Sequence, residues 1–248
     1  MNLWLMQTIY ILGAIAILPL APFLYLQGRY VRRKVGLLPD AAGEKNGRYG
    51  ADEPGVKLLA IGESTVAGLG AKTHETALAG QFARVLSEKI GKSVRWHVIG
   101  KNGVTAKRAL RELVPQIPDE EKFDYIIVGL GGNDVLKLSS PLKWRRNMIK
   151  ILRALRDKHP ESVIFITNVA AIKLSPVLPE PIKFILSRLS RLHNENIKQF
   201  VREFDHVYYY EQPDSVPPDF FADGIHPSEA GYKVWSEEII KTMSRNES

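Results

Sequence analysis

The sequence predicts a three-layer α/β/α sandwich around a five-stranded parallel sheet, preceded by a single N-terminal transmembrane helix. Two patterns predict this arrangement. After Gly55, short apolar runs alternate with longer helical patterns, which is typical of a parallel sheet covered by helices on both faces. Residues 1–28 carry no charged side chain. The length of 248 residues allows one such domain with an appendage.

The N-terminal stretch has the length of a membrane span. Nearly every residue from Leu3 to Leu26 is apolar, and at about 1.5 Å per residue this stretch reaches roughly 36 Å, enough to cross a bilayer with some tilt. A cleaved signal peptide would have a basic start and a small-x-small cleavage site. The segment Leu20-Ala21-Pro22 is a poor site of that kind. We therefore predict an uncleaved membrane anchor over residues 1–28.

A basic cluster follows the predicted anchor and sets its expected orientation. Because positive flanks stay on the cytoplasmic side, the rest of the chain is expected in the cytoplasm, with a periplasmic or extracytoplasmic location as the alternative. Residues 29–55 are then a basic flank and a linker rich in Gly, Pro, Asp and Glu, and residues 56–248 form the folded domain. The basic cluster consists of Arg29, Arg32, Arg33 and Lys34.

Five apolar runs are the candidate strands of the sheet. Residues between them show helical spacing, as in 144–155, where apolar side chains fall on one face and arginines on the other. A last helix is expected from about Pro227 to Met243. Because ligand sites of parallel sheets lie at the carboxyl ends of the strands, the residues that follow each strand are the site candidates. The candidate strands are Lys57–Ile61, Val94–Ile99, Tyr125–Gly129, Val163–Thr167 and Val207–Tyr210.

Composition narrows the classes of function. The chain has no cysteine, so disulfides and thiolate metal sites are excluded, and no histidine pair has the spacing of a zinc motif. We therefore expect neither kind of metal site. The net charge of +7 is concentrated in 143–158 and 183–202, and such basic stripes suit an anionic bilayer or nucleic acid. No nucleic-acid-binding motif is present, so we expect a membrane and no nucleic acid; the oligomeric state stays open.

The glycine-rich segment 61–76, IGESTVAGLGAKTHET, follows the first candidate strand. A phosphate-binding P-loop would need glycine where Val66 and Ala71 stand. A dinucleotide fingerprint would place Thr73 where a small residue must pack against the sheet. Both phosphate-binding interpretations fail, and the segment is predicted to present Ser64 as a nucleophile.

Residues that follow the first three candidate strands and residues just before the last helix together suit acyl transfer. Ser64 would attack a carbonyl carbon and His226 would take its proton, while Asp223, three residues earlier, would orient the imidazole. The N–H groups of Ser64 and Gly103 and the side-chain amide of Asn133 would form the oxyanion hole. Each residue alone has an ordinary structural explanation, such as a helix N-cap for Ser64. Because the structural explanations would have to hold for all four independently, the catalytic interpretation is favoured.

These residues resemble the SGNH (GDSL-type) hydrolases, whose four blocks carry Ser, Gly, Asn and His in this chain order. The resemblance rests on Gly62-Glu63-Ser64, Gly103, Gly131-Gly132-Asn133-Asp134 and Asp223-Gly224-Ile225-His226-Pro227, and it covers roughly 56–243. It implies a flavodoxin-like fold that hydrolyses esters or thioesters without metal or cofactor. One departure is Glu63, which stands where the family usually has Asp; its longer side chain must pack differently.

The expected substrate follows from the apolar surroundings. Segment 169–186 follows the fourth strand, is markedly apolar and contains three prolines. It forms either an acyl-binding wall or a connection that only packs helices. With the anchor, it predicts a membrane-tethered esterase or lipase acting on a small-molecule or lipid-like ester. The alternatives are a carbohydrate O-acyl esterase or acyltransferase, and a non-catalytic binding scaffold.

Overall fold

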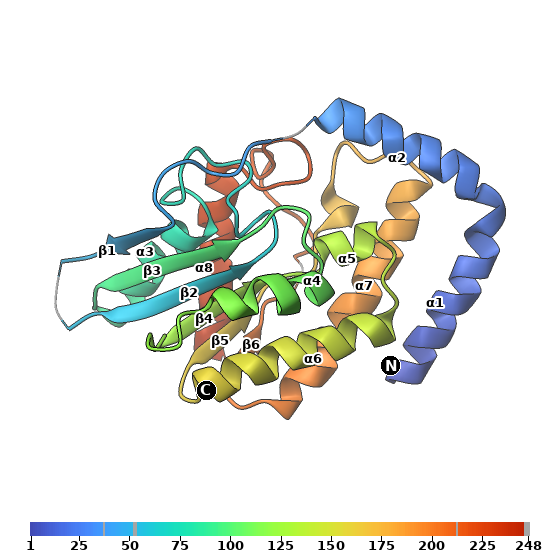
Figure 1. Ribbon diagram of the computed structural model, residues 1–248. Helices are drawn as coiled ribbons and strands as arrows, with labels where there is room; N and C mark the ends of the chain where they lie inside the picture. The colour runs from blue at the N-terminus through green and yellow to red at the C-terminus, as the bar shows by residue number, and fades with distance from the viewer. Residues whose placement is uncertain (37, 52–53, 212, 246–248) are drawn as a thin grey trace.

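A six-stranded sheet forms the centre of the molecule (Figure 1). The computed structural model describes residues 1–36, 38–51, 54–211 and 213–245. The strand order is β1-β3-β2-β4-β5-β6, and all neighbours from β3 to β6 pair in parallel. These parallel strands are the five that the sequence predicts, and the predicted fold class is confirmed. They are β2 (Val56–Gly62), β3 (Val94–Gly100), β4 (Tyr125–Gly129), β5 (Val163–Ile166) and β6 (Val207–Tyr209).

The sixth strand, β1 (Asn46–Tyr49), was not predicted. It pairs antiparallel with β3, from Asn46 opposite His97 to Tyr49 opposite Val94. It lies in the stretch predicted to be a linker, of which residues 52 and 53 are outside the described part. Three of its four residues are exposed, so an edge strand held by backbone pairing has no apolar run that would reveal it.

Helices cover both faces of the sheet (Figure 1). In β2, Leu58 and Ala60 face one apolar layer and Leu59 and Ile61 face the other, which explains its uninterrupted apolar run. One layer contains α3 (Leu78–Ile90) and α8 (Glu229–Arg245); the other contains α4 (Ala106–Glu112), α6 (Pro141–Lys158) and α7 (Ile182–Phe200). The remaining short elements are η2 (Val114–Gln116), α5 (Gly132–Leu136), η3 (Ile172–Leu174) and η4 (Val201–Glu203).

The N-terminal segment is bent rather than straight. Helix α1 (Leu3–Ile17) and helix α2 (Ala21–Val35) are joined by η1 (Leu18–Leu20) and run in different directions (Figure 1). Pro19 and Pro22 lack the N–H that a straight α-helix needs, which explains the bend. By length and composition alone, the helical stretch Leu3–Val35 could cross a membrane. Its outward side chains include Trp4, which is 72% exposed.

The strand order opens a crevice at the carboxyl ends of β2 and β4. From β2 the chain first crosses to β3 on one side and later to β4 on the other, so the loops that follow β2 and β4 diverge. Ser64 follows β2, and Asn133 follows β4. The topology therefore brings two of the predicted site residues to one crevice.

Candidate active site

A tight turn presents Ser64 directly after β2. The strand ends at Gly62, where a Cβ would lie 2.1 Å from the carbonyl oxygen of Gly129, so the strand can pass β4 this closely only with glycine. The N–H groups of Val66 and Ala67 donate to the carbonyl of Glu63 at 3.0 and 2.9 Å. This turn holds Ser64 at the carboxyl end of the sheet.

Ser64, His226 and Asp223 form a hydrogen-bonded series. The Nε2 atom of His226 lies 3.2 Å from Ser64 Oγ, and its Nδ1 atom lies 2.8 Å from Asp223 Oδ2. The other carboxylate oxygen, Oδ1, accepts from the N–H groups of Ile225 at 2.8 Å and His226 at 2.7 Å. The sequence spacing of three residues therefore places the acid and the imidazole on one turn.

The charge of Asp223 fixes the imidazole tautomer. Burial raises the pKa of Asp223, but the hydrogen bonds from the His226 ring and from the two N–H groups outweigh it, so the pKa lies below its ordinary value. An ionised carboxylate only accepts hydrogen bonds. Nδ1 of His226 must therefore carry the proton, and Nε2 faces Ser64 as an acceptor.

Two backbone donors near this series are unengaged. Within residues 1–36, 38–51, 54–211 and 213–245, the N–H groups of Ser64 and Gly103 donate to no other group. Gly103 adopts φ +74° in the loop between β3 and α4, and its carbonyl accepts from Lys137 Nζ at 2.9 Å. Its neighbour Asn102 lines the same cavity as Ser64.

Glu63 connects the serine turn to Asn133. Its carboxylate accepts from the N–H of Gly132 at 2.7 Å, the N–H of Asn133 at 2.8 Å and the Nδ2 of Asn133 at 2.5 Å. Burial raises the pKa of Glu63 to about 7, against the lowering effect of these hydrogen bonds. One of the two amide hydrogens of Asn133 is thus engaged and the other is left for a ligand. The sequence marked Glu63 as unusual but did not predict these contacts.

A large apolar cavity reaches the serine. Its volume is about 940 Å³, and Ser64, Asn133 and His226 all line it. One wall is formed by α1 and α2, and the opposite wall by residues of segment 169–186. That segment therefore lines the cavity, as one of its two interpretations predicted. The participation of the N-terminal helices was not predicted.

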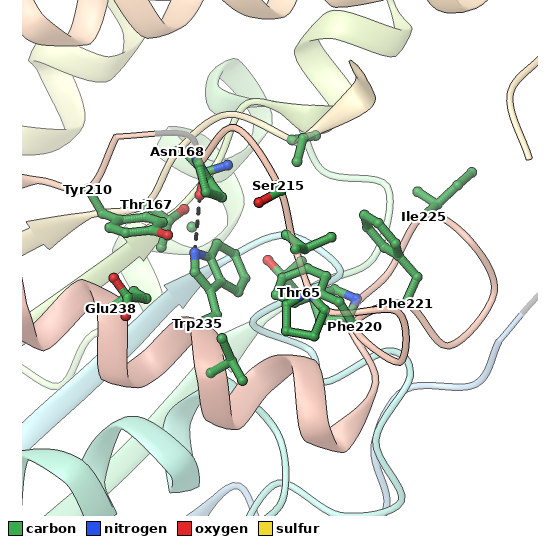
Figure 2. Close-up of a pocket in the computed structure, with 18 of the residues that line it drawn as sticks. Thr65, Thr167, Asn168, Tyr210, Ser215, Phe220, Phe221, Ile225, Trp235 and Glu238 are labelled. Atoms are coloured by element: carbon green, nitrogen blue, oxygen red, sulfur yellow. Dashed lines mark hydrogen bonds between the residues drawn. The ribbon is translucent and has the colours of Figure 1, made fainter. Parts of the chain in front are cut away.

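A second, smaller cavity lies beside the first (Figure 2). Its volume is about 320 Å³, and aromatic side chains, among them Tyr210, Phe220 and Trp235, line it. Trp235 Nε1 donates to Asn168 Oδ1 at 3.1 Å. Ser64 does not line this cavity, but Glu63 lines both. No local sequence pattern predicts this cavity, since its lining comes from residues far apart in the chain.

The histidines other than His226 line neither of the two cavities. His193 is stacked on Trp144 with 4.5 Å between the ring centroids, and burial lowers its pKa to about 3. His159 is also buried. In the part of the chain that the structure describes, no three His, Cys, Asp or Glu side chains are grouped to hold a metal ion.

The fold and the comparisons with known proteins define the class: the chain is a hydrolase of ester bonds. The model of the GDSL-like lipase/acylhydrolase family matches residues 60–234, and the chain belongs to this family. Comparison with curated proteins finds no significant match.

Solved structures share the fold. A lipase from a goat rumen metagenome aligns with a TM-score of 0.61 and 18% identity over 75% of this chain and 97% of its own. A lipase/acylhydrolase from Enterococcus faecalis aligns with 0.56 and 18% over 77% and 96%. A family 3 carbohydrate esterase from Clostridium thermocellum aligns with 0.58 and 17%, also over 77% and 96%. At these identities the likeness shows a shared fold only.

Proposed function

We propose that this protein cleaves carboxylic esters of lipid-like substrates through Ser64, His226 and Asp223. The observation that carries the proposal is the hydrogen-bonded series from Asp223 through His226 to Ser64 Oγ, which ends in a large apolar cavity. An ionised acid behind the imidazole leaves Nε2 free to accept the serine proton.

The reaction proceeds in two halves. Ser64 Oγ attacks the ester carbonyl carbon while its proton passes to His226 Nε2, and the tetrahedral intermediate collapses as Nε2 returns that proton to the leaving alcohol oxygen. The acyl group then remains on Ser64 Oγ. A water gives a proton to Nε2 and attacks the acyl carbon, and the acid is released as the proton returns to Ser64 Oγ.

The oxyanion is stabilised by three donors in this proposal: the N–H groups of Ser64 and Gly103 and the second amide hydrogen of Asn133. Loss of one such donor typically raises the barrier by about 3–4 kcal/mol. Glu63 acts as a positioning residue, because its contacts to Gly132 and Asn133 hold the amide in place.

A carbohydrate O-acyl ester is the second candidate substrate. The smaller cavity supports it, since Tyr210 and Trp235 supply aromatic faces and Asn168 a polar side chain beside the site. An alcohol bound there would also accept the acyl group in place of water, which would make the protein an acyltransferase. The apolar walls of the larger cavity favour the lipid-like ester.

The membrane part of the proposal divides the chain into an anchor over 1–28, a flank and linker over 29–55 and a catalytic domain over 56–248. The basic cluster at the end of α2 supports a cytoplasmic location for that domain. Parts of the basic stripes are engaged within the protein, since Arg145 contacts Glu203 at 2.5 Å and Arg156 donates to four backbone carbonyls. The apolar segment therefore carries the membrane attachment. Resistance of the full chain to alkaline extraction of membranes tests it.

Hydrolysis of p-nitrophenyl esters, from acetyl to palmitoyl, tests the chemistry. Ser64→Ala should abolish the initial rate on every ester. Ser187→Ala, on α7, is the matched control and should leave the rates unchanged. Equal rates for wild type and Ser64→Ala would refute the nucleophile, and no hydrolysis by the folded wild type would refute the esterase.

A further inference from the structure

One face of the N-terminal helices is turned to the reactive serine. Ala21, Leu24, Gly28 and Val31 recur every three or four residues along α2, which places them on one helical face, and they line the large cavity together with Ile17 of α1. At Gly28 a Cβ would meet only Ile182 Cδ1, at 3.9 Å. Glycine and alanine at two of these positions leave the space beside α2 open.

The opposite wall is equally apolar. It is formed by η3, by the start of α7 and by the residues between them, including Ile172, Leu178, Ile182 and Leu186. Ser64 and His226 also line the cavity, as do Arg29 and Arg32 of α2. A long acyl chain attached to an ester at Ser64 would therefore lie between α2 and α7.

Specific hydrogen bonds hold these helices against the domain. Gln27 Nε2 donates to the Glu180 carbonyl at 2.7 Å, and its Oε1 accepts from the N–H of Ile182 at 3.3 Å, a group at the start of α7 that has no partner within its own helix. Gln7 Oε1 accepts from Leu142 N–H in the first turn of α6, at 3.2 Å. A simple tether would not need these contacts.

The other side of the same helices faces outward and is apolar. Leu26 is 61% exposed, Phe23 is 51% exposed and Tyr30 is 59% exposed, and none of the three lines the large cavity. An exposed apolar surface of this kind on a helix that is apolar nearly all round fits contact with lipid. The helices would then touch the bilayer on one face and the substrate on the other.

We infer that α2 is one wall of the binding site for the acyl chain of a membrane lipid, in addition to any role as an anchor. This inference rests on the proposed function of Ser64. The acyl chain lies between α2 and the segment from η3 to the start of α7, with its ester at Ser64. Each methylene that enters such a site raises affinity up to about fourfold.

Matched tryptophan variants of the full chain in mixed micelles test whether α2 forms one wall of the acyl-chain site. Leu24→Trp fills the cavity, whereas Leu26→Trp puts the same side chain on the outward face. Leu24→Trp should lower kcat/KM for dodecanoyl esters at least ten times more than it lowers kcat/KM for acetyl esters. Leu26→Trp should keep the wild-type profile. The same chain-length profile in both variants would overturn the inference while leaving the Ser64 chemistry intact.

A covalent probe locates the chain directly. A dodecyl fluorophosphonate with a terminal diazirine loses fluoride as Ser64 Oγ bonds to phosphorus, and the serine proton leaves through His226. Irradiation should then cross-link residues 14–35 or 172–186. Cross-links confined to the smaller cavity would overturn the inference, and failure of Ser64 to react would refute the proposed function itself. With dodecanoyl lipid in vesicles as substrate, Leu24→Trp should show the same loss of kcat/KM. A loss seen only with soluble dodecanoyl thioesters would overturn the inference that the acyl chain comes from a membrane lipid.

Discussion

Asp223→Asn should trap His226 in the tautomer that cannot accept a proton. In the wild type, Oδ1 of Asp223 accepts from the N–H groups of Ile225 and His226, and Oδ2 faces Nδ1 of His226. An asparagine keeps its oxygen at the two N–H groups and turns its NH₂ group to Nδ1. That nitrogen must then accept, so the proton moves to Nε2 and points at Ser64 Oγ.

The expected loss in rate for Asp223→Asn follows from the two backbone N–H donors. Turning the amide over to restore the reactive tautomer would leave both N–H groups without an acceptor, at about 1–2 kcal/mol each. A total of about 2–4 kcal/mol corresponds to a loss of about 30- to 1000-fold in rate.

Acetyl ester hydrolysis measures this loss as kcat/KM. Because the asparagine preserves the backbone hydrogen bonds, the melting temperature should change by only a few degrees. Asp219→Asn makes the same chemical change at an exposed position and serves as the control. Activity of Asp223→Asn within threefold of wild type, with the fold intact, would refute the role of Asp223.

Two further predictions concern Glu63 and Gly70. Burial raises the pKa of Glu63 from 4.5 to about 7, so between these values the native state binds more protons than the unfolded chain and the free energy of unfolding falls with rising pH, by up to about 3 kcal/mol. In urea denaturation, Glu63→Gln should gain stability relative to wild type between pH 5 and pH 8; parallel pH dependences would contradict this. At Gly70 (φ +93°) a Cβ would lie 2.1 Å from the carbonyl oxygen of Pro227, so Gly70→Ala should displace His226 and lower kcat/KM at least tenfold. Gly91→Ala has a similar φ of +65° with no atom within 4 Å and should lose stability but not activity; equal activity losses in both would count against this coupling.

The parallel strands could be predicted because the sequence records their burial. A strand covered by helices on both faces is apolar at every position, as Leu58 to Ile61 are in β2, so its run of apolar residues stands out. Strand β1 is held by backbone pairing at an exposed edge, and backbone pairing leaves no mark on side-chain composition. The missed strand is therefore the one that has no run of buried apolar residues.

The same distinction applies to the site. Asp223 and His226 lie three residues apart, so their contact follows from local spacing, and Ser64 could be placed beside them because strand ends share an edge. The contact of Glu63 with Asn133 joins residues seventy positions apart and depends on how closely β2 and β4 approach. No local pattern contains that distance. The roles of these residues remain predictions for the variants above to test.

Apolar character on every side of a helix has two physical meanings that hydropathy cannot separate. Lipid can surround the whole helix, or lipid can cover one face while an apolar cavity meets the other. The rare polar side chains distinguish the two cases, because an amide in a bilayer core is costly unless it has a partner. Gln7 and Gln27 find theirs at the starts of α6 and α7. Because both amides bind the domain, the predicted anchor packs against it, and the same helices line the large cavity.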